Sequence, residues 1–480
     1  MNDQAAKKTA REMIIGYFRD FSVLKETRAE YWGIQIVNFL DCTFYFAMLT
    51  IATLFLSHDL GMSDQAAGRT FTVFTASVTI LLTFSGMFCD WLGIRRSLRI
   101  SMWSMLVLRA GMVAVGLMPS LPHRGWLAVI LLALMAPQTA AIQTIFQAAT
   151  QRYTTKRSRS AGFNLWYLFM NVGAMVGGAS VDIVRLALKV PNAHIFTMGV
   201  ITAALCLVAG ETMVHNEVQL RGPDDEPDAP GEKPARKNPL EIMRAVVHEP
   251  ALARLLVLIA LILGVRAVYT YLYMLMPKYW ERTIGPDAAI GVLNMINPFG
   301  IIVGLILFIP IANKFKVFNM LVYGAMVSAI SLFPMALPWQ WYGVGIVKAH
   351  YLMAIICMVI LTIGEVLWSP KLYEYTAAIA PQGQEGTYLG LSMIPWFLAK
   401  SLVSWFSGDW LVRWSPETVN VNGVAVPLQQ AMINNQVDYW HSPGAMWMWL
   451  GVYALVGCII AAMLQGWLTQ GARFQSEKPA

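Results

Sequence analysis

The sequence predicts an all-α membrane protein of twelve transmembrane helices, arranged as two bundles of six. Three observations lead to this fold class. First, 57% of the 480 residues are hydrophobic and only 13% are charged, whereas soluble domains carry about 25% charged residues. Second, apolar runs that match the roughly 20 residues needed to cross a bilayer recur along the chain. Third, a polar, proline-rich stretch separates these runs into two sets of six.

The predicted spans define the organisation of the chain. They cover residues 31–57, 68–92, 98–118, 126–150, 162–187, 194–214, 251–277, 288–313, 317–338, 350–378, 387–412 and 444–469. Residues 221–239 hold five prolines and many charges and cannot bury a core, so a flexible linker is expected there. The expected parts are an amphipathic N-terminal segment (1–30), a first bundle (31–214), a linker (215–250), a second bundle (251–470) and a tail (471–480).

Lysine and arginine residues set the expected orientation. The N-terminal segment and the loops after spans two, four and six are rich in them, whereas the loops after spans three and nine hold only Arg124 and Lys348. Because basic loops stay on the cytoplasmic side, both termini are expected to be cytoplasmic. The expected location is the plasma membrane, which is the inner membrane of a bacterial cell. The external segment 413–443 contains VNVNGVAV and is expected to form a small hairpin.

Composition also limits the kinds of partner that we expect for this protein. The net charge of +7 is explained by the basic loops, so nucleic acid is not expected as a partner. The five cysteines lie in apolar stretches, are odd in number and form no CxxC pair, which argues against disulfides and a zinc site. The seven histidines lie at span ends or in loops. We therefore expect no metal and no cofactor, and a monomer in contact with the lipid bilayer.

The sequence does not predict an enzyme. Membrane enzymes that act on lipid or cell-wall precursors usually show clustered Asp, His or Arg in a loop at the membrane surface. The sequence has no such cluster, so no catalytic residues are expected.

One loop carries a recognisable motif. Between spans two and three the chain reads Gly86-Met-Phe-Cys-Asp90-Trp-Leu-Gly93-Ile-Arg95-Arg96. We expect Gly86 to let two helices approach closely, Gly93 to permit a tight turn, and the arginines to meet lipid headgroups. Asp90 would end a helix near an arginine or a helix N-terminus. The loop resembles the signature G-x-x-x-D-x-x-G-x-R-R of the major facilitator superfamily, which implies that fold and a gating role for these five residues.

The loop after span eight reads Pro310-Ile-Ala-Asn313-Lys314-Phe-Lys316 and resembles a degraded copy of the same signature. Its recurrence in both halves indicates a duplicated fold.

Two spans resemble a particular family within that superfamily, the proton-dependent oligopeptide transporters. Residues 162–173 (GFNLWYLFMNVG) are similar to that family's fifth span, and residues 364–375 (GEVLWSPKLYEY) resemble its tenth. The chain departs from the family in span one, where Asn38, Asp41 and Cys42 stand in place of E-x-x-E-R-F. Gln143 stands where the family has a lysine. Proton coupling would therefore rest on other residues.

Charged side chains inside the spans are the candidate functional residues. A charge near the bilayer centre costs about 2.5–3.5 kcal/mol or more, so each needs a partner or water. Helical spacing places each of them on a polar face together with aromatic or amide side chains. The predicted solute-contacting set is Asp41, Tyr45, Tyr167, Asn171, Arg266, Tyr269, Tyr273, Asn297, Glu365, Trp368, Trp396 and Lys400.

Each type of side chain in this set has an expected role. Arg266 and Lys400 would meet a carboxylate or phosphate, whereas Asp41 and Glu365 would meet an amine or carry a proton. The aromatic residues would supply apolar contact and stacking. An alternative is that buried ion pairs such as Arg266–Glu365 or Lys400–Glu365 only fix helix register.

Other charged residues have expected structural roles. A structural role is favoured for Arg109. Snorkelling would explain the charges near span ends, which are Asp182, Arg185, Lys371, Asp409 and Arg413.

These features together predict a secondary active transporter. It would move a small amphoteric or anionic organic solute, peptide- or amino-acid-like by resemblance, by alternating access and by proton-coupled symport. Two alternatives remain open at this point: a drug or lipid (lysolipid) exporter of the same fold, and a non-transporting solute sensor.

Overall fold

The computed structural model describes residues 19, 21–155, 157–215, 220, 249–312, 316–380 and 394–472. The first half of the chain folds into long helices that match the first six predicted spans. They are α2 (Ala29–Leu54), α3 (Asp64–Leu92), α4 (Ile94–Leu117), α5 (Arg124–Arg152), α6 (Arg159–Asp182) and α7 (His194–Met213). A short helix η1 (Phe21–Glu26) precedes α2, and the π-helical turns η2 (Phe55–Asp59) and η3 (Ile183–Ala187) extend α2 and α6.

The second half supplies the other six spans. They are α9 (Pro250–Met274), α11 (Ile290–Ala312), α12 (Val317–Ile330) with its continuation α13 (Phe333–Ala336), α14 (Ile346–Ile379), α16 (Ile394–Trp414) and α18 (Pro443–Met463). Shorter elements connect them: α10 (Met276–Thr283), η4 (Trp339–Tyr342), β1 (Thr418–Val421), β2 (Val424–Pro427), α17 (Leu428–Ile433), η5 (Tyr439–His441) and α19 (Gln465–Leu468).

Hydropathy supports the prediction of an all-α membrane protein. In the described part of the chain, nine helical segments are long and apolar enough to cross a bilayer. The other three predicted spans correspond to α3, α11 and α16. The predicted linker at 221–239 and the loop motif at Asn313 and Lys314 lie outside the described residues.

Local chemistry explains several element boundaries. The Ser63 Oγ accepts a hydrogen bond from the Ala66 N–H and caps α3. Pro250 and Pro443 begin α9 and α18, where a missing N–H costs little. Gly93 has φ 81° between α3 and α4, so the predicted tight turn is confirmed.

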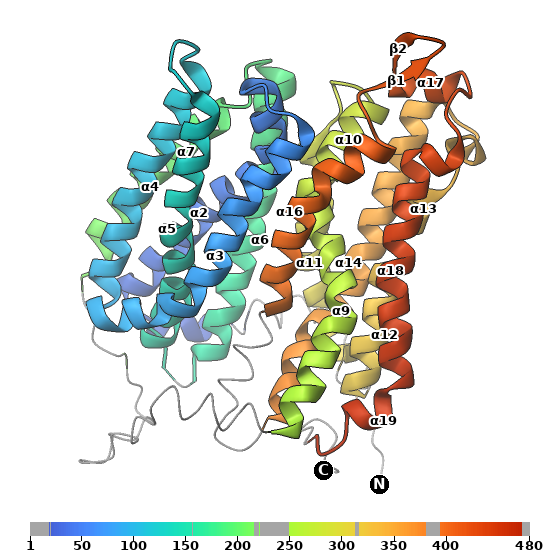
Figure 1. The fold of residues 1–480 in the computed structure, drawn as a ribbon. Coiled ribbons are helices and arrows are strands. Elements are labelled where there is room, and N and C mark those ends of the chain that lie inside the picture. Colours follow the sequence, from blue (N-terminus) through green and yellow to red (C-terminus); the bar gives the residue numbers. More distant parts are fainter. Residues whose placement is uncertain are drawn as a thin grey trace.

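The predicted hairpin is also confirmed. Strands β1 and β2 pair antiparallel, with Thr418 opposite Pro427 and Val421 opposite Val424. The intervening Asn422 and Gly423 both have positive φ, at 52° and 86°, as tight two-residue hairpin turns require. Figure 1 shows this hairpin at one end of the molecule, with α19 at the opposite end. We call these the hairpin end and the opposite end.

Two helix bundles lie side by side (Figure 1). In the first, α2 packs against α6 and α7, and α5 packs against α3 and α4. In the second, α14 packs against α11 and α12, and α9 packs against α16 and α18. Helices α3 and α16 join the bundles on one side, and α6 and α11 join them on the other.

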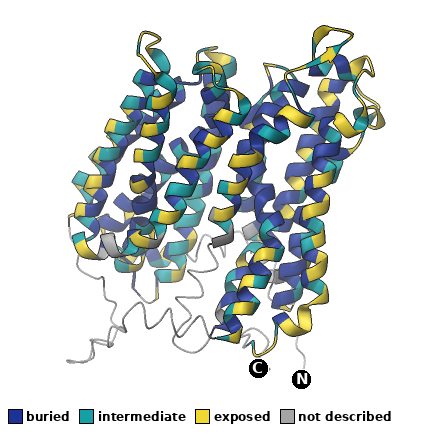
Figure 2. Ribbon diagram, viewed as in Figure 1, coloured by how far each residue is buried: buried dark blue, intermediate teal, exposed yellow. Residues whose placement is uncertain are grey.

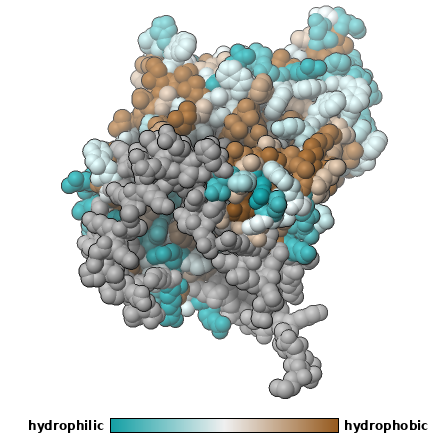
Figure 3. All heavy atoms as spheres, turned by 60° about the horizontal axis from the view of Figure 1, so that its bottom comes forward, coloured by the Kyte–Doolittle hydropathy of each residue, from teal (hydrophilic) through white to brown (hydrophobic). Residues whose placement is uncertain are grey.

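The surface of the described chain suits a lipid environment. Figure 2 shows that buried residues line the inside of each bundle, whereas exposed residues follow the outward faces. Many of those exposed residues are large and apolar, among them Trp91, Trp126 and Met463. Figure 3 shows apolar residues gathered between hydrophilic residues nearer the two ends. Exposed apolar area of this extent marks contact with lipid rather than water.

Candidate functional site

Side chains from both bundles meet near the middle of the molecule. Lys400 of α16 donates a hydrogen bond from Nζ to the hydroxyl of Tyr45 on α2, over 3.1 Å. Phe46, next to Tyr45, packs against Tyr273 of α9 with ring centroids 6.0 Å apart. Around these contacts lie most of the predicted solute-contacting residues. We call them the central cluster: Tyr45, Tyr167, Arg266, Tyr273, Asn297, Glu365, Trp396 and Lys400.

Two cations of the central cluster share one tryptophan. The Arg266 guanidinium lies 4.3 Å from the ring centroid of Trp368 and 5.3 Å from that of Trp396. The Lys400 Nζ lies 4.8 Å from the Trp396 centroid. Each cation–π contact contributes about 0.5–2 kcal/mol, more when the pair is shielded from water. Arg266 is 4% exposed, so its charge is held by aromatic faces in a nearly dry position.

Neither cation is neutralised by an ion pair within the described residues. The alternative that Arg266–Glu365 or Lys400–Glu365 pairs fix the helix register is therefore wrong for this structure. Two positive charges next to one tryptophan repel each other, and an anion placed between them would relieve that repulsion. The geometry thus favours binding of a carboxylate or phosphate at this position.

Glu365 is the acidic member of the central cluster. Its Oε2 accepts a hydrogen bond from the Asn297 Nδ2 over 2.9 Å, and the same amide donates to Thr362. Glu365 is half-buried on α14. Its charge interacts with Arg266 but forms no ion pair with it. A carboxyl group with a single amide donor can exist in protonated and ionised forms, as proton exchange requires.

The first bundle contributes Tyr167 from α6. This tyrosine interacts electrostatically with Glu365 and Arg266 of the second bundle. The neighbouring Asn171 donates from Nδ2 to the Tyr167 carbonyl oxygen over 2.9 Å. Asn171 thus uses its amide to bond to the backbone of its own helix.

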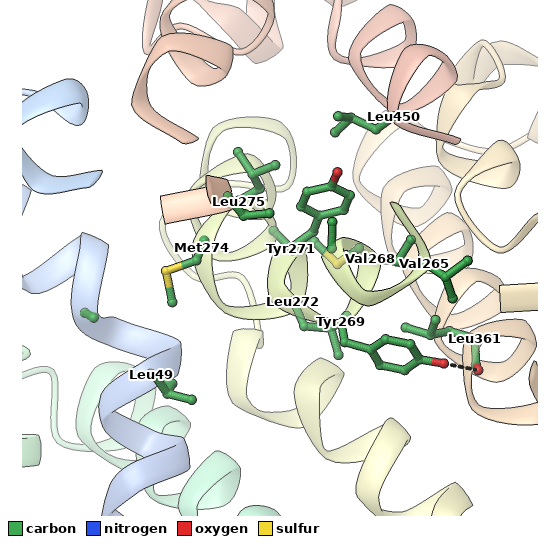
Figure 4. Close-up of a cluster of buried hydrophobic side chains, with 14 of the residues drawn as sticks. Leu49, Val265, Val268, Tyr269, Tyr271, Leu272, Met274, Leu275, Leu361 and Leu450 are labelled. Carbon is green, nitrogen blue, oxygen red and sulfur yellow. Dashed lines mark hydrogen bonds between the residues drawn. The ribbon is translucent and has the colours of Figure 1, made fainter. Parts of the chain in front are cut away.

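Two predicted contact residues lie behind the central cluster rather than in it. The Trp368 Nε1 donates to the Tyr269 hydroxyl and to the Ser328 Oγ, each over 3.1 Å. Tyr269 also bonds to the Leu361 carbonyl oxygen, and Figure 4 shows it directed toward Leu361 and away from Leu49 of the first bundle. The Tyr269 hydroxyl is thus used inside the second bundle, and a contact between Tyr269 and solute stays a prediction. Trp368 instead supports Arg266.

Asp41 is also placed differently from the expectation. Its Oδ1 pairs with Arg109 over 2.5 Å inside the first bundle, and both side chains are buried. Arg109 further donates to the Gly199 carbonyl oxygen and lies 3.9 Å from the Phe44 ring centroid. The structural role expected of Arg109 agrees with this geometry. Asp41, by contrast, is not brought to the central cluster, because its charge is already paired.

A network of ion pairs joins the bundles at the hairpin end, and no sequence pattern predicted it. The Asp64 carboxylate accepts from the Lys278 Nζ over 2.5 Å and from Arg282 over 2.7 Å. Both cations are on α10, four residues apart and therefore on one face. Burial lowers the pKa of Lys278, an effect that Asp64 opposes. We call Asp64, Lys278 and Arg282 the hairpin-end gate.

Further contacts support this gate. The Asp182 carboxylate accepts from the backbone N–H groups of Gly291 and Val292, each over 2.8 Å, and so caps α11. Arg185 donates to the Ala288 carbonyl oxygen, and Gln65 donates to Asp409 over 2.7 Å. Snorkelling is therefore the wrong explanation for Asp182, Arg185 and Asp409, which make specific contacts between bundles.

The loop motif is described in part. Arg95 is half-buried and Arg96 is exposed, while the side chain of Asp90 lies outside the described residues. A Cβ added at Gly86 would meet no described atom within 4 Å. The close helix contact expected of Gly86 is not seen among the described residues and stays a prediction. By contrast, a Cβ on Gly291 would lie 2.0 Å from the Gly178 carbonyl oxygen, so the bundles touch there.

Comparison with known proteins identifies a family model and solved structures that are similar to this chain. The family model for the Major Facilitator Superfamily matches residues 34–404. A crystal structure of the POT family transporter PepTSo is similar with a TM-score of 0.69 and 14% identity, over 93% of this chain and 99% of that one. A structure of a peptide transporter POT in complex with sulfate is similar with a TM-score of 0.69 and 14% identity, over 93% and 96%.

A third solved structure belongs to a bacterial homologue of the human drug peptide transporters PepT1 and PepT2. It has a TM-score of 0.67 and 15% identity, over 92% of this chain and 98% of that one. Identities this low establish the fold alone. Among curated proteins, none matches the sequence of this chain.

Proposed function

Because this chain belongs to the major facilitator superfamily of secondary transporters, we propose that it moves a small anionic or amphoteric organic solute by proton-coupled symport. The observation that carries this proposal is the pair of cations, Arg266 and Lys400, whose charged groups both lie close to Trp396. They supply two positive charges and an aromatic face at one place. A peptide- or amino-acid-like solute offers a matching carboxylate and an apolar body.

Glu365 is the proposed proton carrier. It lies in the same cluster as the cations, on a half-buried position with one amide donor. Its protonation would change the net charge of the site by one unit, which links solute affinity to the proton gradient. Asp41, the other carboxylate expected in this role, forms an ion pair with Arg109.

Alternating access follows from the two bundles. In the proposed orientation the hairpin end is external, and the hairpin-end gate closes that side. Solute would then enter or leave the central cluster from the cytoplasmic, opposite end. The loop that contains Gly86, Asp90, Gly93, Arg95 and Arg96 is the proposed gate of that end in the alternate state.

The chemical class of the solute can be tested by binding. Purified protein is screened by thermal shift against dipeptides, amino acids and phosphate esters, each beside its uncharged ester. Since a ligand stabilises the state that it binds, the free acid should raise the melting temperature more than the ester does. Arg266→Ala should remove this preference. Equal shifts for acid and ester, or no shift with any anionic compound, would overturn the proposal.

A further inference from the structure

A second site lies at the hairpin end of the second bundle, apart from the central cluster. It is a groove of about 200 Å³ that opens to solvent, between the segment before α14 and the segment that follows the hairpin. Ligand pockets commonly occupy about 300–1,000 Å³, so this groove suits only a small molecule. Its walls include Met335, Trp339, His350, Met432, Val437 and Tyr439.

His350 is the feature that points to a ligand. It lines the groove at the start of α14 and is only 3% exposed. One ring nitrogen, Nδ1, bonds to the Tyr279 hydroxyl over 2.8 Å. The other, Nε2, is buried and has no hydrogen-bond partner among the described residues. A buried polar atom without a partner is unfavourable, so a ligand atom that reached Nε2 would be stabilised by the new bond.

Several other polar groups of the groove make hydrogen bonds within the protein. Tyr439 donates its hydroxyl to the Ala336 carbonyl oxygen, and the Ser442 Oγ donates to the Tyr439 carbonyl oxygen. On the rim, Gln340 donates to Asn435 over 3.2 Å. The described residues that line the groove include no Asp, Glu, Lys or Arg. A charged molecule would therefore lose its hydration without gaining an ion pair.

We propose that this groove binds a small neutral molecule with an aromatic or aliphatic body and one hydrogen-bonding group that meets the Nε2 of His350. Trp339 and Tyr439 provide aromatic surface, and Met335 and Met432 can adapt to the shape of an apolar body. The ligand class differs from the solute of the central cluster, which is charged. The groove also adjoins α10, because Tyr279 is next to Lys278 of the hairpin-end gate.

The test uses two probes that differ in one group, 1-naphthol and 1-methylnaphthalene. Their binding to the full-length protein in lipid nanodiscs is measured by calorimetry, with empty nanodiscs to subtract partition into lipid. Wild-type protein should bind 1-naphthol about tenfold more tightly, the factor that corresponds to about 1.4 kcal/mol. His350→Phe should remove this preference and leave the affinity for 1-methylnaphthalene unchanged.

Two tryptophan substitutions separate the groove from other apolar surface. Val437→Trp fills the groove and should abolish saturable binding of both probes. Val344→Trp adds the same side chain to a nearby residue that does not line the groove, and should bind as wild type does. Equal binding of the two probes by wild-type protein would overturn the proposal, and so would unchanged binding by Val437→Trp. Neither measurement depends on transport, so the proposed function can fail without affecting this one.

Discussion

At the scale of single residues, the surroundings of Arg266 in the central cluster are the feature that most favours an anion. Arg266 has aromatic faces beside it instead of a carboxylate, and its guanidinium Nε is buried without a hydrogen-bond partner among the described residues. A position of this kind is costly in the absence of an anion and favourable in its presence. Solute binding would therefore recover part of the free energy that the buried charge costs the empty protein.

Replacement of Arg266 by alanine should weaken solute affinity at least about tenfold, because a charge-assisted hydrogen bond contributes about 1.5–3 kcal/mol. The affinity is measured with the anionic compound that gives the largest thermal shift. Arg413→Ala is the matched control, since Arg413 also lies over a tryptophan, Trp414 at 4.8 Å, but is exposed. Equal affinities for wild type and Arg266→Ala would remove Arg266 from the site.

Asp41→Asn should destabilise the protein without removing solute binding. Loss of one partner from a buried ion pair costs about 3–5 kcal/mol, because Arg109 is then left charged and unpaired. The expected readout is a lower melting temperature with an unchanged shift on addition of solute. A stable Asp41→Asn protein that has lost solute binding would instead return Asp41 to the functional site.

At the scale of elements, the short helix α10 has the clearest mechanical role. It carries both cations of the hairpin-end gate, and Glu281 of the same helix lies 3.5 Å from His58 and 3.4 Å from Arg185 in the first bundle. Opening of the hairpin end requires all these contacts to break.

Asp64→Asn should open the hairpin end more often, because Lys278 and Arg282 would lose the carboxylate that holds α10 to the first bundle. Asn294→Cys provides a reporter, since Asn294 is buried between the bundles and bonds to Thr50. Its labelling by an impermeant maleimide should be several-fold faster in the Asp64→Asn background. Asp438→Asn, an exposed carboxylate at the same end, is the control and should leave the rate unchanged.

The close contact between the two bundles can be tested with a substitution that adds volume. A methyl group on Gly291 would collide with the Gly178 carbonyl oxygen of the first bundle, so Gly291→Ala should prevent full closure of the hairpin end. Faster labelling of the same reporter cysteine is expected. Gly466→Ala adds the same methyl group on α19, at the opposite end, where no described atom is within 4 Å, and should not change the labelling rate. Equal rates in the two variants would contradict the closed contact.

At the scale of the whole molecule, the layout was predictable because hydropathy is a local property. The spans, the turn at Gly93 and the hairpin at Asn422 and Gly423 all follow from neighbouring residues. Helical spacing placed Arg266 and Lys400 on polar faces, and in the structure both lie near Trp396. Helical spacing could not say which helix a face would meet, so Asp41 was expected in the site although it pairs with Arg109.

The features that could not be predicted depend on contacts between residues far apart in the sequence. Asp64 and Lys278 are brought together only when the two bundles close against each other. Asp64 and Lys278 lie just outside the predicted spans, where a charged side chain does not need a partner, so no pairing was predicted for them. The hairpin-end gate and the groove beside His350 therefore required the three-dimensional arrangement.

The most direct test of the central claim is solute accumulation in proteoliposomes under an inward proton gradient. The wild-type protein should concentrate the anionic solute above its equilibrium level. Glu365→Gln should allow exchange of solute across the membrane but no accumulation, because the proton carrier is lost. Asp287→Asn, which alters an exposed carboxylate, should accumulate solute as wild type does. Accumulation by Glu365→Gln equal to that of wild type would contradict proton coupling through the central cluster.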